Sequence, residues 1–317
     1  MSGLFELPME LVNEICSHLS PQSLNIFINS STVIEKLSPS VLDELLPTQK
    51  LWIFKCAANS PDQDPLMQSL LPDLLKHSKA DPLLGVQALL CACANGHVQS
   101  VSTLLDGGID PNGAVAGVSA LMEAVGGQDY RSSALVTGRL LARGADIHAQ
   151  DSKGLTALHY AAKAGNTRII TLLLMAGCDV NGTDAEMSGT SPIILASQKG
   201  QYAAVESLID HGADVNARDK LRRTPLIHAA NEGMTAVVRL LISRGVDLDC
   251  GSIFGKAALS YASEKGSIEI VKLLVDAGCD VSHQDMRGNT ALHLCSQPSF
   301  PFTAIADIIR AAAHEDV

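Results

Sequence analysis

The sequence of 317 residues is poor in aromatic side chains and in positive charge. Phenylalanine, tryptophan and tyrosine make up 3% of the residues, although 46% are hydrophobic, so an aliphatic core rich in small residues is expected. Lysine and arginine total 23 against 34 acidic residues, which gives a net charge of −11. Because nucleic-acid phosphates are neutralised by clusters of basic residues, this balance argues against a nucleic-acid partner.

The sequence also lacks the apolar runs that target proteins to membranes or span them. No stretch reaches the roughly 20 apolar residues of a membrane helix, and Met1–Glu6 lacks the basic and apolar regions of a signal peptide. Eight cysteines are present, but Cys91 and Cys93 have the wrong spacing for a zinc ligand pair. We therefore expect reduced thiols, no metal site, no membrane partner and a cytoplasmic or nuclear location.

Motifs for catalysis are missing as well. The sequence contains no nucleophile elbow, no Walker loop, no zinc-protease helix and no dinucleotide-binding fingerprint. Gly182–Gly189 is not followed by the lysine of a phosphate-binding loop. The sequence therefore predicts no catalytic residue and no cofactor.

A helix–turn–helix unit recurs along most of the chain. In residues 154–181, a threonine N-cap opens a short helix that ends at Gly165, and a second apolar helix ends at Gly177. Aligned on the position of His159, further copies lie at Leu90, Met122, Ile194, Ile227, Ser260 and His293, in steps of 32 to 37 residues. One such unit is too small to bury its own apolar faces, so stacked copies must share a core.

The recurring unit resembles the ankyrin repeat. The resemblance rests on Thr156-Ala-Leu-His159, Thr224-Pro-Leu-Ile227 and Thr290-Ala-Leu-His293, and on Gly177-Cys-Asp-Val-Asn181 and Gly212-Ala-Asp-Val-Asn216. It implies an all-α ankyrin-repeat solenoid, in which helix–turn–helix repeats are joined by β-hairpin-type loops. Seven repeats are expected in residues 84–297, a degenerate copy in residues 47–83 and a C-terminal capping helix in residues 298–317.

One copy is longer than the others. From Met122 to Gly144 it has four more residues than the corresponding stretch of the other copies. Since insertions in repeat proteins map to loops, we expect the extra residues near Gly126–Arg131, between the two helices of this copy.

Residues 1–46 do not follow the repeat pattern. Leu7-Pro8, Glu10-Leu11, Ile15, Leu19 and Leu24 have the order and spacing of an F-box, and the layout resembles that of fungal proteins that join an F-box to ankyrin repeats. This resemblance implies an F-box-like helical region whose contact with a Skp-type adaptor of a cullin ubiquitin ligase is formed by Leu7, Pro8, Leu11, Ile15 and Leu19. Alternatively, these apolar helices only cap the exposed end of the array.

Two ladders of residues on the first helices are candidates for a partner-binding groove. The position after His159 faces the concave groove in the ankyrin family, and here the candidates are Glu123, Tyr160, His228 and Tyr261. One helical turn later come Lys163, Gln198, Asn231 and Glu264. We interpret both ladders as an amphipathic groove for an unidentified client protein, with the two tyrosines as anchors. A catalytic hypothesis instead pairs His228 with Glu264 as base and acid in a closed pocket.

These features predict a non-catalytic protein-binding chain. The resemblances imply that it is the substrate-recruiting subunit of a Skp–cullin–F-box ubiquitin ligase. The alternatives are an ankyrin scaffold without a ubiquitin role and, less favoured, an enzyme that acts on a small molecule in the groove.

Overall fold

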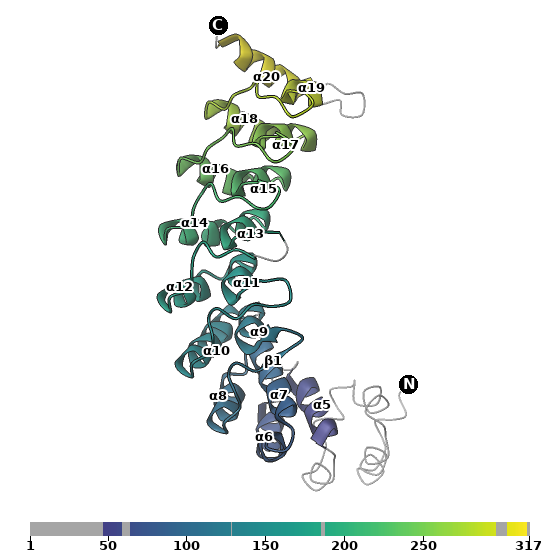
Figure 1. Cartoon of the computed structure of the whole chain (residues 1–317), viewed down its shortest axis with the longest axis vertical. Helices are drawn as coiled ribbons and strands as arrows, with labels where there is room; N and C mark the ends of the chain where they lie inside the picture. Colours follow the sequence, from purple (N-terminus) through teal and green to yellow (C-terminus); the bar gives the residue numbers. More distant parts are fainter. Residues whose placement is uncertain (1–46, 59–63, 128, 185–187, 296–302, 316–317) are drawn as a thin grey trace, which may run out of the picture. The chain divides into compact units, whose positions relative to one another are not determined.

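The computed structural model describes residues 47–58, 64–127, 129–184, 188–295 and 303–315. The predicted F-box-like region, residues 1–46, lies outside the described residues, and with it lie Leu7, Pro8, Leu11, Ile15 and Leu19. The chain divides into two compact units after Ala149, and each unit is built from consecutive pairs of helices (Figure 1).

The first unit contains three helix pairs in its described residues. α5 (Pro47–Ala58) pairs with α6 (Asp64–Ser78), α7 (Pro82–Ala94) with α8 (Val98–Asp106), and α9 (Ala120–Gly126) with α10 (Tyr130–Ala142). α7 packs against both α5 and α9, and α8 packs against both α6 and α10, so the helices form two layers. The core between the layers is mostly aliphatic and includes the buried side chains of Leu70, Leu89, Leu104 and Leu140.

A short β-hairpin precedes α9. β1 (Ala114–Val115) pairs with β2 (Val118–Ser119) in antiparallel fashion, with Val115 opposite Val118. The turn residues Ala116 and Gly117 both have positive φ, 52° and 81°, which is the backbone of a type I′ turn. Ser119 then caps α9, because its hydroxyl accepts a hydrogen bond from the N–H of Met122.

The extra residues of the longer copy extend a helix, so the expectation of a loop insertion is wrong. α10 has 13 residues, whereas its counterpart α12 (Thr167–Met175) has nine, and only residues 127–129 separate α9 from α10. The carboxylate of Asp129 accepts hydrogen bonds from the N–H groups of Arg131 and Ser132. This N-cap starts α10 about one turn early, which absorbs the four residues.

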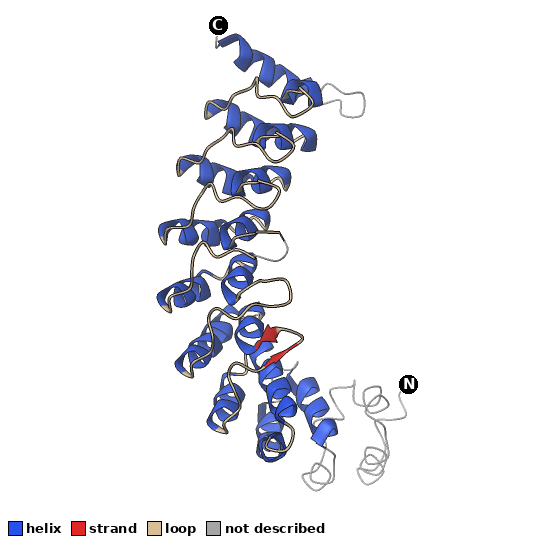
Figure 2. Ribbon diagram, viewed as in Figure 1, coloured by secondary structure: helices blue, strands red, loops and turns tan. Residues whose placement is uncertain are grey.

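The second unit contains five helix pairs in its described residues. The first helices are α11 (Ala157–Ala164), α13 (Pro192–Gln198), α15 (Pro225–Asn231), α17 (Ala258–Lys265) and α19 (Ala291–Cys295). The second helices are α12, α14 (Tyr202–Asp210), α16 (Thr235–Ser243), α18 (Ile268–Asp276) and α20 (Thr303–Glu315). First helices pack on first helices and second helices on second helices, which gives two layers (Figures 1 and 2). The core between these layers includes Leu158, Ile170, Leu173, Ile193 and Leu241.

Hydrogen bonds between successive repeats of the second unit fix their register. The side-chain oxygen of Asn181 accepts from the N–H of Asp214 (2.8 Å), and its amide donates to the carbonyl of Gly212 (3.3 Å). Nδ1 of His159 accepts from the N–H of Thr156 (3.1 Å), and its Nε2 lies 3.0 Å from the carbonyl oxygen of Thr190 in the next repeat. The bonds of Asn181 and the contact of His159 Nε2 satisfy backbone groups of the next repeat, so neighbouring repeats stabilise one another.

All helices of the described chain are short. The longest, α6, has 15 residues. None of the helices in the described ranges combines the length and the apolar composition that crossing a bilayer requires.

Candidate functional site

The loops that lead into the first helices of the second unit share one construction. In three of them an aspartate (Asp151, Asp219 or Asp285) donates its N–H to the carbonyl of the residue four positions later. The carboxylate of the same aspartate accepts the N–H of that residue, at 2.9, 2.7 and 2.9 Å. Before α17, Ser252 closes the loop through its N–H and the carbonyl of Lys256 (3.0 Å). We call residues 151–155, 219–223, 252–256 and 285–289 the hairpin loops.

Three residues of the first predicted ladder are tied to these hairpin loops. Tyr160 Oη donates to Asp151 Oδ2 (2.7 Å), His228 Nε2 lies 3.0 Å from Asp219 Oδ2, and Tyr261 Oη donates to Ser252 Oγ (3.3 Å). In each case the partner lies nine residues earlier, so the contact recurs with the repeat. The polar ends of these side chains therefore attach α11, α15 and α17 to the hairpin loop that precedes each of them.

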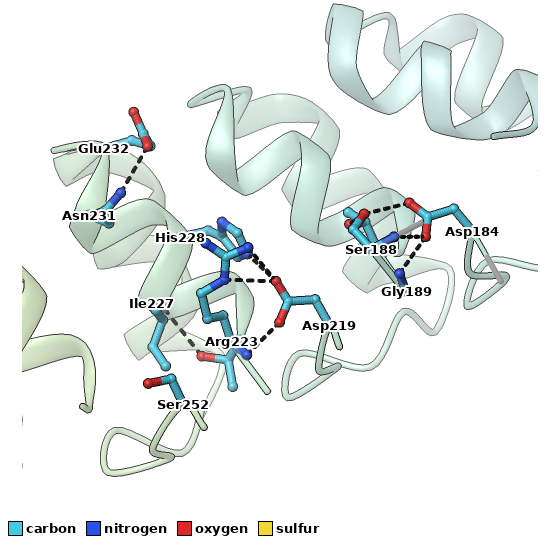
Figure 3. Close-up of polar contacts among 12 residues, drawn as sticks. Asp184, Ser188, Gly189, Asp219, Arg223, Ile227, His228, Asn231, Glu232 and Ser252 are labelled. Atoms are coloured by element: carbon cyan, nitrogen blue, oxygen red, sulfur yellow. Dashed lines mark hydrogen bonds and ion pairs between the residues drawn. The ribbon is translucent and has the colours of Figure 1, made fainter. Parts of the chain in front are cut away.

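The most enclosed of these contacts joins His228, Asp219 and Arg223 (Figure 3). The side chain of Asp219 is 1% exposed, and its Oδ2 lies 2.9 Å from Arg223 Nε and 3.0 Å from His228 Nε2. Its Oδ1 accepts the N–H of Arg223 at 2.7 Å. Burial lowers the pKa of His228 below its ordinary value, so the imidazole is neutral at neutral pH and donates through Nε2.

The pairing of His228 with Glu264 that the catalytic hypothesis requires is not formed. Glu264 makes an ion pair with Lys256, while the buried ring of His228 is bonded to Asp219. A hollow does lie beside Tyr261, but neither Tyr160 nor His228 lines it. His228 therefore supports the loop before α15.

The two buried histidines predict that stability depends on pH. Burial is the main cause that lowers the pKa of His159 and of His228 below 6.5, against opposing hydrogen bonds to the Thr190 carbonyl and to Asp219. As the pH falls, the unfolded chain therefore binds protons at these two histidines before the folded chain does. The folded state keeps its full stability above pH 6.5 and loses stability as the pH falls toward the folded pKa values. We expect the melting temperature to fall by about 5 °C between about pH 7 and about pH 5.

Thermal unfolding followed by circular dichroism at the two pH values measures this effect. His228→Gln retains a donor for Asp219 but cannot take up a proton, so its melting temperature should change less. His148→Gln alters an exposed ring and should leave the full pH dependence in place. Carboxylates such as Asp280, whose pKa a hydrogen bond from Ser282 lowers below 3.8, affect stability only in more acidic solution. A melting temperature that is equal at both pH values would contradict the prediction.

The second predicted ladder lies toward the ends of the first helices and is more open. Lys163 is exposed, and its backbone carbonyl accepts a hydrogen bond from Gln201 Nε2 (3.2 Å). Asn231 Nδ2 donates to Glu232 Oε1 (2.9 Å), and Gln198 is half-buried at the end of α13. Lys163, Gln198 and Asn231 do not line the hollow beside Tyr261.

Tyr261 and Glu264 are brought together in a hollow of about 520 Å³. It is bounded by α17, α19 and the last two hairpin loops, with walls that include Phe254, Met286 and Arg287. Nζ of Lys256 lies 5.9 Å from the centre of the Tyr261 ring and also pairs with Glu264. The hollow therefore offers both apolar and charged surface to a ligand.

Sequence reasoning missed three exposed apolar side chains on the hairpin loops. Leu221, Phe254 and Met286 are 38%, 56% and 79% exposed. Backbone hydrogen bonds link their loops, from the N–H of Ile253 to the carbonyl of Leu221 (2.9 Å) and from the N–H of Met286 to the carbonyl of Phe254 (3.0 Å). We call Leu221, Phe254 and Met286 the tip row. The signal in the sequence is a large apolar residue one or two positions after Asp219, Ser252 and Asp285.

Glu123 belongs to the first unit, where it lines a separate hollow. It is half-buried in α9, and burial raises the pKa of its carboxyl group. The hollow has a volume of about 250 Å³ and is also lined by Lys55, Gln87 and Val115. Nζ of Lys55 donates to Gln87 Oε1 (3.1 Å).

Comparisons with known proteins agree with this architecture. The family described as "Ankyrin repeats (3 copies)" matches residues 130–219 and 216–285. The crystal structure of the human ASB11 ankyrin repeat domain is similar with a TM-score of 0.61 at 24% identity, over 71% of this chain and 96% of that one. The chain therefore contains ankyrin repeats and has the ankyrin-repeat solenoid fold, as the sequence predicted.

Several proteins have sequences similar to short stretches of this chain. The mouse B-cell lymphoma 3 protein homolog is 40% identical over 73 residues, which are 23% of this chain and 16% of that protein. A putative ankyrin repeat-containing protein of Treponema pallidum is 33% identical over 130 residues, which are 38% of this chain and 43% of that protein. E3 ubiquitin-protein ligase KEG of Arabidopsis thaliana is 41% identical over 81 residues, which are 25% of this chain and 5% of that protein. The chain thus spans less than half the length of each of these relatives. Its ankyrin repeats mark it as a protein–protein interaction module, a class that is typically non-catalytic.

Proposed function

We propose that the second unit holds a client protein on its first helices and hairpin loops. We further propose that residues 4–46 dock a Skp-type adaptor, so that the chain recruits the client to a cullin ubiquitin ligase. The observation that carries client binding is the tip row beside the 520 Å³ hollow, where large apolar side chains are exposed on loops that hydrogen bonds hold in place. Grouped apolar side chains on a protein surface mark interaction sites.

The adaptor contact is supported by the motif that runs from Leu7-Pro8 through Leu11 and Ile15 to Leu19. These residues lie outside the described ranges, so the support is the sequence itself. One relative with similar repeats, the Arabidopsis protein KEG, is an E3 ubiquitin-protein ligase, and this agrees with repeats of this kind serving ubiquitin transfer. A recruiting subunit needs two binding surfaces and no catalytic side chain of its own.

Copurification of a purified Skp-type adaptor with the full chain tests this role. Leu7→Asp and Leu11→Asp each place a carboxylate in the proposed apolar contact, so we expect the recovered adaptor to fall at least about tenfold. Leu221→Asp is the matched control, because it makes the same change on an exposed loop of the second unit and should leave adaptor recovery unchanged.

Circular dichroism spectra of all three variants establish that they fold like the wild type. If the folded wild-type chain retains no adaptor, the ubiquitin role is lost and the chain is an ankyrin scaffold whose N-terminal region only covers the array. Equal recovery with wild type and both N-terminal variants would show that the motif is not the contact.

A further inference from the structure

A separate candidate site lies in the first unit, in the hollow of about 250 Å³ that Glu123 lines. Its walls come from α5, α7 and α9, the first helices of the three pairs, and from β1. α7 packs against α5, α9 and β1, so these elements meet around the hollow (Figure 1). The type I′ turn fixes the hairpin that carries Val115, and the hollow is therefore formed before any ligand binds.

The charged groups of this hollow are not paired with one another. Nζ of Lys55 donates to Gln87 Oε1 (3.1 Å), whereas the carboxylate of Glu123 makes no hydrogen bond or ion pair within the described ranges. Glu123 is half-buried, so its charge loses part of its hydration without gaining a cation, and burial raises the pKa of its carboxyl group. A cation supplied by a ligand would offset this cost.

The remaining walls of the hollow are apolar. Leu90 is buried, and the half-buried residues around it are Cys91, Ala94 and Val115. Arginine and lysine have long apolar stems that cover such surface while their charged ends bind a polar group. Both carboxylate oxygens of Glu123 are open, and a guanidinium presents two parallel N–H groups to them, whereas an ammonium acts as a point charge. Glu123 therefore favours arginine over lysine.

Lys55 determines what surrounds this arginine. Its ammonium has the same charge as a bound guanidinium, so a run of basic residues is disfavoured in the hollow. An ammonium has three N–H groups and a side-chain amide has two, so Lys55 and Gln87 both have N–H groups left to donate after their mutual hydrogen bond. A carboxylate accepts such bonds. An arginine with an acidic residue close to it in sequence therefore complements the whole hollow.

The arginine has to come from another molecule. The residues outside the described ranges contain no arginine, and Lys36 is their only lysine. The first unit has three arginines, Arg131, Arg139 and Arg143, which lie in α10 or directly after it, and none of them lines the hollow.

We infer that this hollow binds an arginine side chain of a partner protein, with an acidic residue of the same segment beside it. The guanidinium pairs with Glu123, and the stem of the arginine lies on Leu90 and Val115. The acidic side chain accepts hydrogen bonds from Lys55 and Gln87. The inference goes beyond the client site proposed on the second unit, because it uses none of the residues of that site.

NMR of the full chain with labelled methyl groups tests this inference, because it detects weak binding and locates it. The probe is a capped peptide, Ala-Glu-Ala-Arg-Ala-Glu-Ala, whose arginine and glutamates share one face of an extended backbone. The matched control carries citrulline, which is uncharged, in place of arginine. We expect saturable shifts of the Leu90 and Val115 methyl signals, and none of Leu241 in the core of the second unit. Affinity should be at least about tenfold weaker for the citrulline peptide.

Three variants of the chain assign the contacts. Glu123→Gln keeps the shape of the side chain without its charge, so affinity should fall about tenfold. Glu264→Gln makes the same change at another half-buried glutamate of a first helix and should leave affinity unchanged. Lys55→Met keeps the apolar stem; it should weaken binding of the glutamate peptide several-fold, but not of a peptide with alanine in place of both glutamates. The methyl spectra also establish that the variants fold like the wild type.

The inference is wrong if the Leu90 and Val115 signals do not shift, or if the citrulline peptide binds as tightly as the arginine peptide. Equal affinity of wild type and Glu123→Gln would also overturn it. Arginine amide that binds as tightly as the peptide would assign the hollow to small guanidinium compounds instead of a protein segment. None of these outcomes involves the adaptor or the tip row, so this inference and the proposed function fail independently.

Discussion

Replacing Asp219 by alanine is expected to lower the free energy of unfolding by about 3 kcal/mol. The side chain is 1% exposed and accepts hydrogen bonds from the N–H and guanidinium of Arg223 and from Nε2 of His228. Alanine removes all of these acceptors, and the buried imidazole loses its partner. Arg223 is 33% exposed and can turn toward water, which keeps the cost at the lower end of the range for broken buried pairs.

Urea unfolding followed by circular dichroism measures this loss. Asp276→Ala is the matched control, because Asp276 is exposed at the end of α18 and its removal should change the free energy by less than about 0.5 kcal/mol. Asp219→Asn keeps an acceptor oxygen and should cost about half as much as alanine. If Asp219→Ala and Asp276→Ala unfold at the same urea concentration, the cluster does not stabilise the repeat.

The second large effect is expected at Gly255. Gly255→Ala should lower the free energy of unfolding by about 2–3 kcal/mol, and Gly245→Ala by about 1 kcal/mol. The two glycines have nearly the same φ, +76° and +73°, so alanine bears the same backbone strain at both. A Cβ at Gly255 would lie 2.8 Å from the backbone nitrogen of Met286, whereas a Cβ at Gly245 meets nothing within 4 Å.

The difference between the two variants in urea unfolding isolates the close approach of the hairpin loops. Gly255→Ala should also disturb the hydrogen bond from the N–H of Met286 to the carbonyl of Phe254. Equal losses of stability in both variants would mean that neighbouring loops yield to the added methyl group.

The repeat architecture was predictable from local sequence, because its determinants act over a few residues. Gly165 ends α11 with φ of +79°, as the sequence predicted from the cost that other residues pay in that conformation. The period of the copies then required stacking, since a single copy cannot bury its apolar faces. The comparison with the ASB11 domain confirms this fold class.

The candidate groove was predictable only in part. The ladder positions locate Tyr160, His228 and Tyr261 on the first helices α11, α15 and α17, but their polar ends bond to loop residues nine positions earlier. Such partners depend on the fold of the hairpin loop, which helical periodicity does not describe. The role of the two ladders in binding a client therefore stays a prediction. The misplaced insertion has a similar cause, because Asp129 was not recognised as the N-cap of α10.

The sequence by itself determined that this chain is built from stacked helix pairs, because threonine caps, left-handed glycines and apolar periodicity act locally. Only the tertiary structure decided which side chains are exposed on the hairpin loops and which form hydrogen bonds to these loops. Leu221, Phe254 and Met286 are exposed because backbone hydrogen bonds between repeats hold their loops side by side. His228 is buried because the Asp219 carboxylate binds it within its own repeat. Both outcomes depend on contacts between separate segments of the chain, and residue periodicity carries no record of those contacts.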